Sequence, residues 1–378
     1  MSERPLDVAV VIGTRPEAIK LAPVILEAQE RPGEFSLCVV RTGQHRELVD
    51  QLMDEFGIRT DVDLNVMQPK QKLAHVMAES VRGLSELFAL RQPDWVLVQG
   101  DTTTTFAGAL AAFYNHVRVG HVEAGLRTGD RQSPFPEEAN RSMTACIADL
   151  HFAPTEQARS NLLQQGVAAH DIVVTGNTVI DMLFRTVQRP RPGGVDATGS
   201  LPSPYVLVTI HRRENQGTAL HDVCDALLAL LAEHPQLSLW VPMHPSPDVR
   251  GVLVARLSAH ARALLTEPLG YTNFVAAMHG AALVLTDSGG VQEECAALGK
   301  PVLVLRADTE RPEAVDAGVA MLVGTGSSRI VTVASELLRD PERHRDMARP
   351  TTAFGDGRAA GRILDAIAAA RRPSVVSG

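Results

Sequence analysis

The sequence predicts two α/β domains in tandem, each built on a parallel, doubly wound sheet. Short β-branched runs alternate with longer amphipathic segments, which is typical of parallel strands joined by helical crossovers. The alternation stops at Gln188–Pro204, a segment crowded with Pro, Gly and Ser, and then starts again. At 378 residues the chain is also longer than one hydrophobic core usually becomes.

The apolar runs place the expected strands and the domain boundaries. The first domain, residues 1–187, has expected strands at Val8–Ile12, Leu37–Val40, Trp95–Gln99, Val117–Val122 and Ile172–Thr175. After a linker at residues 188–204, the second domain, residues 205–358, has expected strands at Tyr205–Ile210, Leu237–Val241, Leu283–Thr286, Val302–Leu305 and Met321–Val323. The alanine-rich pattern Ala359–Arg371 predicts a helix, so that residues 359–378 would pack back on the first domain. A ligand is expected between the domains, facing the carboxyl ends of both sets of strands.

Composition argues against several classes of partner. The formal charge of −8, with Lys+Arg 36 against Asp+Glu 44, gives no reason to expect binding to nucleic acid or to anionic membranes. Four well-separated cysteines without a CxxC pair favour reduced thiols, and the 13 histidines include no HExxH motif, so no metal site is expected. The run Val8–Ile12 is too short for a signal peptide or a membrane span, and a cytoplasmic protein is expected.

The densest group of charges lies at His121–Thr128 and Pro134–Arg141. These segments carry three glutamates and two arginines that follow a predicted strand. Because an unpaired buried charge is costly, the groups either compensate one another structurally or line a cleft that binds a substrate.

Each predicted sheet also offers an anion site where a strand turns into a helix. Thr14 and Glu17 fit a capping box, but Arg15 at the positive end of a helix is unfavourable unless an anion compensates it. In the second domain, Ser288–Gly290 would let a phosphate approach the free N–H groups of a helix start, although a plain helix cap explains the same residues.

Two further polar positions have alternative explanations. Asp101 follows a strand and could act in catalysis or simply as the N-cap of a helix from Thr102 onward, with Thr102–Thr105 as a polar helix start. His211 also follows a strand and could pair with Glu214 at the surface, although such dense motifs at strand ends are more often functional.

Seven motifs together resemble one family, and they occur in unchanged order from about residue 8 to about residue 325. GxGxxG after a strand and GxxxxGK[ST] are both absent, so redox-dinucleotide and P-loop functions lose their main support. The seven motifs are Gly13–Glu17 with Lys20, Gln99–Thr103, His121–Arg127, Pro136–Arg141, His211–Asn215, Asp287–Gly290 and Glu310–Glu313. They are similar to those of the UDP-N-acetylglucosamine 2-epimerases, in the non-hydrolysing bacterial branch.

The resemblance implies a glycosyltransferase-B-like architecture, two Rossmann-type domains facing across a cleft that holds UDP, usually as a homodimer. It implies catalytic roles for Asp101, Glu123, Glu137 and His211, supported by Lys20 and Arg141. It implies UDP binding by Arg15, His211, Phe274, Ser288, Gly289, Gly290, Glu294 and Arg311. A second, activating UDP-GlcNAc would contact Gln44, His45, Gln71, Arg212 and His244.

The implied reaction interconverts UDP-GlcNAc and UDP-ManNAc without a redox cofactor or a metal. UDP would leave to give a 2-acetamidoglucal and then add back, with proton transfer by clustered carboxylates. Three alternatives remain open at this point. A hydrolysing epimerase would release free ManNAc and UDP, a glycosyltransferase would need an acceptor surface, and a UDP-sugar sensor would not need Asp101, Glu123 and Glu137 together.

Overall fold

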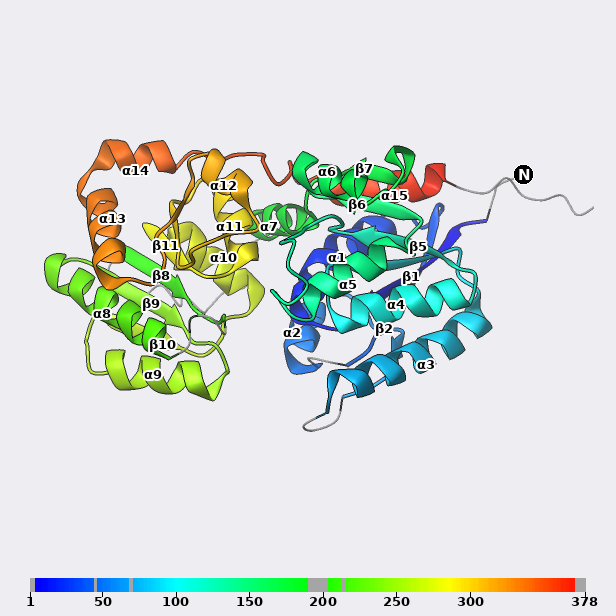
Figure 1. The fold of residues 1–378 in the computed structure, drawn as a ribbon, viewed down its shortest axis with the longest axis horizontal. Helices are drawn as coiled ribbons and strands as arrows, with labels where there is room; N and C mark the ends of the chain where they lie inside the picture. Colours follow the sequence, from blue (N-terminus) through cyan, green and yellow to red (C-terminus); the bar gives the residue numbers. More distant parts are fainter. Residues whose placement is uncertain are drawn as a thin grey trace, which may run out of the picture. The chain divides into compact units, whose positions relative to one another are not determined.

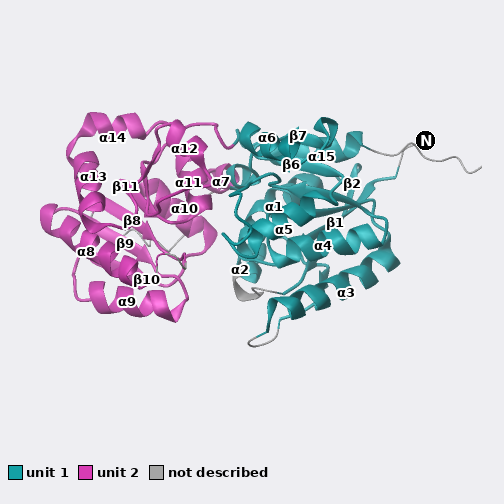
Figure 2. Ribbon diagram, in the orientation of Figure 1, with its two compact units in different colours: residues 1–182, 355–378 teal, residues 183–354 magenta. Residues whose placement is uncertain are grey.

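The computed structural model describes residues 4–43, 46–67, 71–189, 203–212, 215 and 217–370. They form two compact units, residues 1–182 with 355–378 and residues 183–354 (Figure 2). The chain passes between the units within α7 (Thr178–Gln188), which lies earlier than the boundary after residue 187 that the sequence suggests. It returns at Gly355, shortly before α15 (Ala359–Ala369).

Each unit is built on a parallel sheet, as the sequence predicts (Figure 1). In unit 1 the strand order is β3-β2-β1-β4-β5-β6-β7. Its strands are β1 (Leu6–Ile12), β2 (Phe35–Arg41), β3 (Val62–Asp63), β4 (Trp95–Gln99), β5 (Arg118–Val122), β6 (Leu150–Ala153) and β7 (Ile172–Val174). Its helices, besides α7 and α15, are α1 (Arg15–Gln29), α2 (Arg46–Phe56), α3 (Leu73–Arg91), α4 (Thr103–Tyr114), α5 (Glu137–Ala145) and α6 (Glu156–Gln164).

Unit 2 repeats this plan with the strand order β10-β9-β8-β11-β12-β13. Its strands are β8 (Tyr205–Thr209), β9 (Ser238–Pro242), β10 (Ala263–Thr266), β11 (Leu283–Thr286), β12 (Val302–Val304) and β13 (Ala320–Leu322). Its helices are α8 (Thr218–Glu233), α9 (Pro247–Leu257), α10 (Tyr271–Gly280), α11 (Gly289–Leu298), α12 (Pro312–Asp316), α13 (Ser327–Arg339) and α14 (Pro341–Met347). None of the helices in the described ranges combines the length and apolarity needed to cross a membrane.

All ten expected strands are present, with ends shifted by at most two residues. Three further strands, β3, β6 and β10, are not predicted by the sequence. Strand β3 has two residues at the sheet edge, and β10 is an edge strand that is only half buried, so neither produces a continuous apolar run. Strand β6 is buried but has only four residues, which is too short for a clear pattern.

The strand order locates the point in each sheet where ligands of doubly wound folds usually bind. The order reverses between β1 and β4 in unit 1 and between β8 and β11 in unit 2, so the connections leaving these strands diverge there. The Gly13–Glu17 and Gln99–Thr103 motifs follow β1 and β4. The His211–Asn215 and Asp287–Gly290 motifs follow β8 and β11 in the same way.

Candidate functional sites in the two units

One buried carboxylate joins the two loops at the switch point of unit 1. Glu17 accepts hydrogen bonds from the N–H groups of Gly13 (3.1 Å) and Thr14 (2.5 Å). It also accepts hydrogen bonds from the hydroxyls of Thr102 (2.7 Å) and Thr105 (3.2 Å), across the start of α4. Burial raises the pKa of Glu17, while these hydrogen bonds act in the opposite direction. The loop that carries Arg15 and the loop that carries Asp101 are thereby fixed to each other.

Glu123, directly after β5, lies at the centre of a group of hydrogen-bond donors. Its backbone has a φ of 62°, which is uncommon for a residue other than glycine and is typical of functional sites. Its Oε1 accepts from the ammonium of Lys20 and from Nδ2 of Asn177, the latter at 2.9 Å, and its Oε2 accepts from Nε2 of Gln99. With a residue exposure of 7%, Glu123 is a buried carboxylate whose negative charge is compensated by Lys20 and by two amides.

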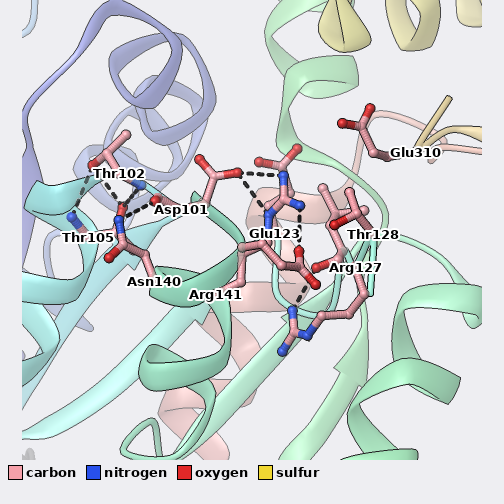
Figure 3. A network of polar contacts seen from close by, with 12 residues as sticks. Asp101, Thr102, Thr105, Glu123, Arg127, Thr128, Asn140, Arg141 and Glu310 are labelled. Carbon is pink, nitrogen blue, oxygen red and sulfur yellow. Dashed lines mark hydrogen bonds and ion pairs between the residues drawn. The ribbon is translucent and has the colours of Figure 1, made fainter. Parts of the chain in front are cut away.

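A second carboxylate, Asp101, lies at the end of the neighbouring strand β4 (Figure 3). Its Oδ2 accepts from both Nε (2.9 Å) and Nη2 (2.7 Å) of Arg141, whose Nη1 donates to Glu138 at 3.0 Å. The alternative role of Asp101 as the helix N-cap is wrong: Thr102 caps α4, because its hydroxyl accepts the N–H of Thr105. Asp101 is 27% exposed at its side chain and is held by one guanidinium.

The two glutamates at the start of α5 differ in environment. Glu138 is buried and accepts from the backbone N–H of Gly129 and from Arg141. Glu137, which the resemblance singles out, is half buried. Glu137 and Glu138 precede Arg141 by four and three residues, so both can face the Arg141 side of α5, and Glu138 is the one whose carboxylate accepts from Arg141.

Two buried histidines lie on the paired strands β5 and β6 of unit 1. His121 of β5 lies opposite His151 of β6, and its Nε2 is 2.8 Å from the carbonyl oxygen of Gly100. Burial lowers the pKa of His121 to about 3 and that of His151 to about 4. Both pKa values lie below the ordinary value of about 6.5, so the neutral rings stabilise the fold above pH ~6.5, and this stabilisation is lost as the pH falls towards 4.

The melting temperature is therefore expected to fall between pH 6.5 and pH 4.5. Burial raises the pKa of Asp181 to about 6 and also raises the pKa of Glu17, so these two contributions change in the opposite direction over part of this range, whereas both histidines act over the whole of it. Differential scanning calorimetry should show a shallower fall for His151→Gln than for the unchanged protein. The exposed His170→Gln serves as the control, and an equal pH slope in all three proteins would contradict the assignment.

In unit 2, a fully buried aspartate organises the loop after β8. Asp287 accepts from the backbone N–H groups of His211 and Arg212 and from Nδ2 of Asn215. It also lies 2.8 Å from Nδ1 of His211. Burial alone would raise the pKa of Asp287, but hydrogen bonding and the charge of His211, together with the backbone N–H groups, lower it overall. The His211 ring is thus oriented by a carboxylate partner that the sequence analysis did not identify.

The start of α11 has the geometry of an anion site. Ser288 occupies the N-cap position, yet within the described structure its hydroxyl makes no capping hydrogen bond. A Cβ on Gly290 would meet no described protein atom within 4 Å, whereas a Cβ on Gly289 would lie 3.1 Å from Cζ of Arg311. Gly289 is therefore explained by packing against Arg311, while Gly290 leaves open space next to the free N–H groups of a helix start.

The remaining polar groups near this turn are paired. Arg311 is buried and donates from Nε to Glu293 at 2.6 Å. Glu294, one helical turn into α11, is buried and accepts from the Tyr271 hydroxyl at 2.7 Å. Phe274, in the first turn of α10, is half buried. Glu294 thus has one oxygen engaged by a tyrosine, a residue the sequence analysis did not single out.

Comparison with known proteins identifies the family. A family model described as UDP-N-acetylglucosamine 2-epimerase matches residues 27–368. The UDP-N-acetylglucosamine 2-epimerase of Bacillus subtilis is 48% identical over 364 residues, covering 95% of this chain and 94% of that protein. The chain belongs to the UDP-N-acetylglucosamine 2-epimerase family.

Solved structures of the family share the fold over nearly the whole chain. The epimerase of Neisseria meningitidis, bound to UDP-GlcNAc, matches with a TM-score of 0.91 and 42% identity, covering 96% of this chain and 99% of that one. The UDP complex of Staphylococcus aureus MnaA matches with a TM-score of 0.90 and 42% identity, covering 98% and 99%. The expected glycosyltransferase-B-like fold class of this epimerase-family chain is confirmed.

Four of the residues expected to act in catalysis lie close together in unit 1 of this epimerase-family protein. Asp101 and Glu123 follow the carboxyl ends of β4 and β5. Lys20 is paired with Glu123, and Arg141 is paired with Asp101. Arg15 is the first residue of α1.

The residues expected at a second UDP-GlcNAc site are only partly described. Two of them, Gln44 and His45, lie outside the described residues. The same holds for Glu214, which the sequence offered as a partner of His211. Gln71 contacts Met67, and Arg212 lies 3.9 Å from Glu310. The His244 ring lies 5.9 Å from the ring of His211.

Proposed function

We propose that this protein interconverts UDP-GlcNAc and UDP-ManNAc as a non-hydrolysing 2-epimerase. The observation that carries the proposal is the pair Glu123 and Asp101, two carboxylates on adjacent strand ends, each held by its own cation. Family membership supports the activity, and relatives from N. meningitidis and S. aureus are described as bound to UDP-GlcNAc and to UDP.

The proposed chemistry starts with loss of UDP. Carbon 2 of the hexose carries an acetamido group and no neighbouring carbonyl, so its proton is not acidic enough for direct removal. Breaking the C1–O bond while a base takes the C2 proton gives a 2-acetamidoglucal and UDP. Re-addition of UDP at C1, with a proton delivered to the opposite face of C2, gives the epimer and balances the reaction without an oxidant or reductant.

The residues of unit 1 would transfer the protons. Lys20, Gln99 and Asn177 donate to Glu123, which favours its ionised form and so lets it act as a base. Asp101 offers a second carboxyl group at the end of the next strand. Lys20 and Arg141 would hold these two groups in place. Glu137 would orient the sugar from the start of α5.

The residues of unit 2 would hold the nucleotide. The N-terminus of α11, with Ser288, Gly289 and Gly290, would bind the diphosphate, and His211 would stabilise its charge as the C1–O bond breaks. Arg15 of unit 1 would add a further cation. Glu294 would accept hydrogen bonds from the ribose, with Phe274 beside the uracil and Arg311 supporting the turn from beneath Gly289.

Proton NMR of UDP-GlcNAc incubated with the protein in deuterated water tests the proposal. Appearance of UDP-ManNAc with deuterium at C2 and no free sugar is the expected result. Free ManNAc with UDP would support the hydrolysing alternative instead. Unchanged UDP-GlcNAc would contradict the epimerase proposal.

Gly290→Ala is expected to fold normally and to lower UDP affinity by about tenfold or more. Its methyl group meets no described protein atom, but it would occupy the space that a phosphate needs. Gly289→Ala is the comparison, because its Cβ lies close to Arg311 and should lower the melting temperature as well. Isothermal titration calorimetry with UDP measures the difference, and unchanged affinity in Gly290→Ala would place the diphosphate elsewhere.

The resemblance further supports a homodimer that acts in the cytoplasm on nucleotide sugars for envelope polysaccharides. We also propose a second UDP-GlcNAc site near Arg212 and His244.

Among the described residues, no group of three potential ligands could hold a metal ion.

A further inference from the structure

Asn177 lies between the buried carboxylate Glu123 and the helix that leaves unit 1. The residue is 1% exposed and immediately precedes α7. Its Nδ2 donates to Oε1 of Glu123 at 2.9 Å, and its Oδ1 accepts the backbone N–H of Val179 at 3.2 Å. Both ends of the amide are therefore used, the oxygen at the helix start and the nitrogen at the carboxylate.

The two connecting segments of the chain meet at this residue. The chain leaves unit 1 within α7 and returns to it at Gly355. A Cβ on Gly355 would lie 3.2 Å from Cα of Gly176 and 3.3 Å from N of Asn177. Asp181, one turn further along α7, accepts from the N–H groups of Ala359 and Ala360 at the start of α15. The segment around Asn177 is thus packed against the returning chain as well as against Glu123.

We propose that Asn177 is a positioning residue for proton transfer, whose amide holds Glu123 in place and ties it to the segments that connect the two units. The inference rests on the proposed function in one respect, namely that Glu123 exchanges a proton with the sugar. Asn177 itself is assigned no contact with the substrate.

The charges around Glu123 determine what a change at Asn177 would do. Lys20 from α1 is the cation bonded to it, and Gln99 from β4 is neutral. Asp101, after β4, is paired with Arg141, and His121 on β5 is buried with its pKa lowered to about 3, so it remains neutral near pH 7. A carboxylate at position 177 would therefore add a new negative charge within hydrogen-bond distance of Glu123.

Two substitutions separate the helix start from the carboxylate contact. Aspartate and serine both accept hydrogen bonds at helix starts, so Asn177→Asp and Asn177→Ser should preserve α7. Asn177→Ser removes the amide donor only, whereas Asn177→Asp also adds charge. Asn115→Asp, at the end of α4, makes the same chemical change in the same unit away from Glu123 and is the matched control.

Turnover measured from pH 5 to 9 is the first readout. We expect Asn177→Ser to lower kcat by roughly tenfold with little change in KM. We expect Asn177→Asp to lower kcat at pH 7 by roughly 100-fold, with the acid limb of the kcat profile shifted upward by about one pH unit. UDP affinity and the profile of Asn115→Asp should match those of the unchanged protein. Unaltered kcat and pH profiles in both Asn177 variants would overturn the inference.

Carbon NMR of protein labelled with ¹³C at glutamate Cδ is a second readout that needs no activity. The Glu123 signal is identified by its loss in Glu123→Gln, and its titration midpoint should move upward in Asn177→Asp but not in Asn115→Asp. An unmoved midpoint would overturn the coupling between Asn177 and Glu123. If the midpoint moves but the unchanged protein does not epimerise UDP-GlcNAc, the positioning contact stands and the proposed function fails.

Discussion

Asp101→Asn and Glu123→Gln are each expected to lower epimerase turnover by about 10²- to 10⁴-fold while UDP still binds. An amide keeps the shape of the carboxylate but can neither take nor return a proton at neutral pH, and general acid–base catalysis contributes about this much to enzymatic rates. UDP affinity should change little, because the proposed diphosphate site lies in unit 2. A coupled enzyme assay of UDP-ManNAc formation measures turnover. Calorimetry with UDP measures UDP affinity separately.

The two variants differ in their expected effect on stability. Arg141 keeps Glu138 as a partner when Asp101 is neutralised, so Asp101→Asn should unfold at nearly the same urea concentration as the unchanged protein. Glu123→Gln leaves Lys20 buried beside a neutral group, which should cost about 3 kcal/mol or more. Glu34→Gln, an exposed change in the same unit, is the control. Near-normal turnover in both Asp101→Asn and Glu123→Gln would overturn the assigned roles.

Asp287→Asn is expected to weaken UDP binding by about 100-fold and to lower the free energy of unfolding of unit 2 by about 3 kcal/mol. The buried carboxylate accepts from two backbone N–H groups and from Asn215, and it faces Nδ1 of His211. An amide would turn its own N–H groups towards some of these donors, so the loop that carries His211 would lose its alignment. Urea denaturation and calorimetry with UDP are the measurements.

Asp225→Asn provides the matched control in unit 2. Asp225 pairs with Arg256 at the surface, where ion pairs contribute little, so UDP affinity and stability should stay close to those of the unchanged protein. Asp287→Asn with unchanged UDP affinity would show that the orientation of His211 does not matter for the nucleotide.

The sequence predicted the central strands well because parallel strands are buried on both faces and appear as continuous apolar runs. Strand β1, for example, is buried along almost its whole length. Edge strands such as β3 and β10 bury less surface and leave no such pattern. Buried strands also make the polar loops that follow them easy to recognise. The loops after β1, β4, β8 and β11 each end a continuous apolar run.

The partners of the site residues could not be predicted because they come from distant parts of the chain. Asn177 reaches Glu123 over 54 residues, and Asp287 reaches His211 over 76. Only the strand order brings these loops together. Asp287 belongs to the Asp287–Gly290 motif, and its place at the end of β11, which pairs with β8, is the signal in the sequence that points to His211. Asn177 follows β7 in the same way and could have been found by the same rule.

A crystal structure of the protein with UDP-GlcNAc bound is the most direct test of the proposed reaction. We expect the diphosphate at the free N–H groups of the α11 N-terminus, beside Gly289 and Gly290, with C2 of the hexose within about 3.5 Å of a carboxylate oxygen of Glu123 or Asp101. A nucleotide bound away from the start of α11, or a hexose that neither carboxylate reaches, would contradict it.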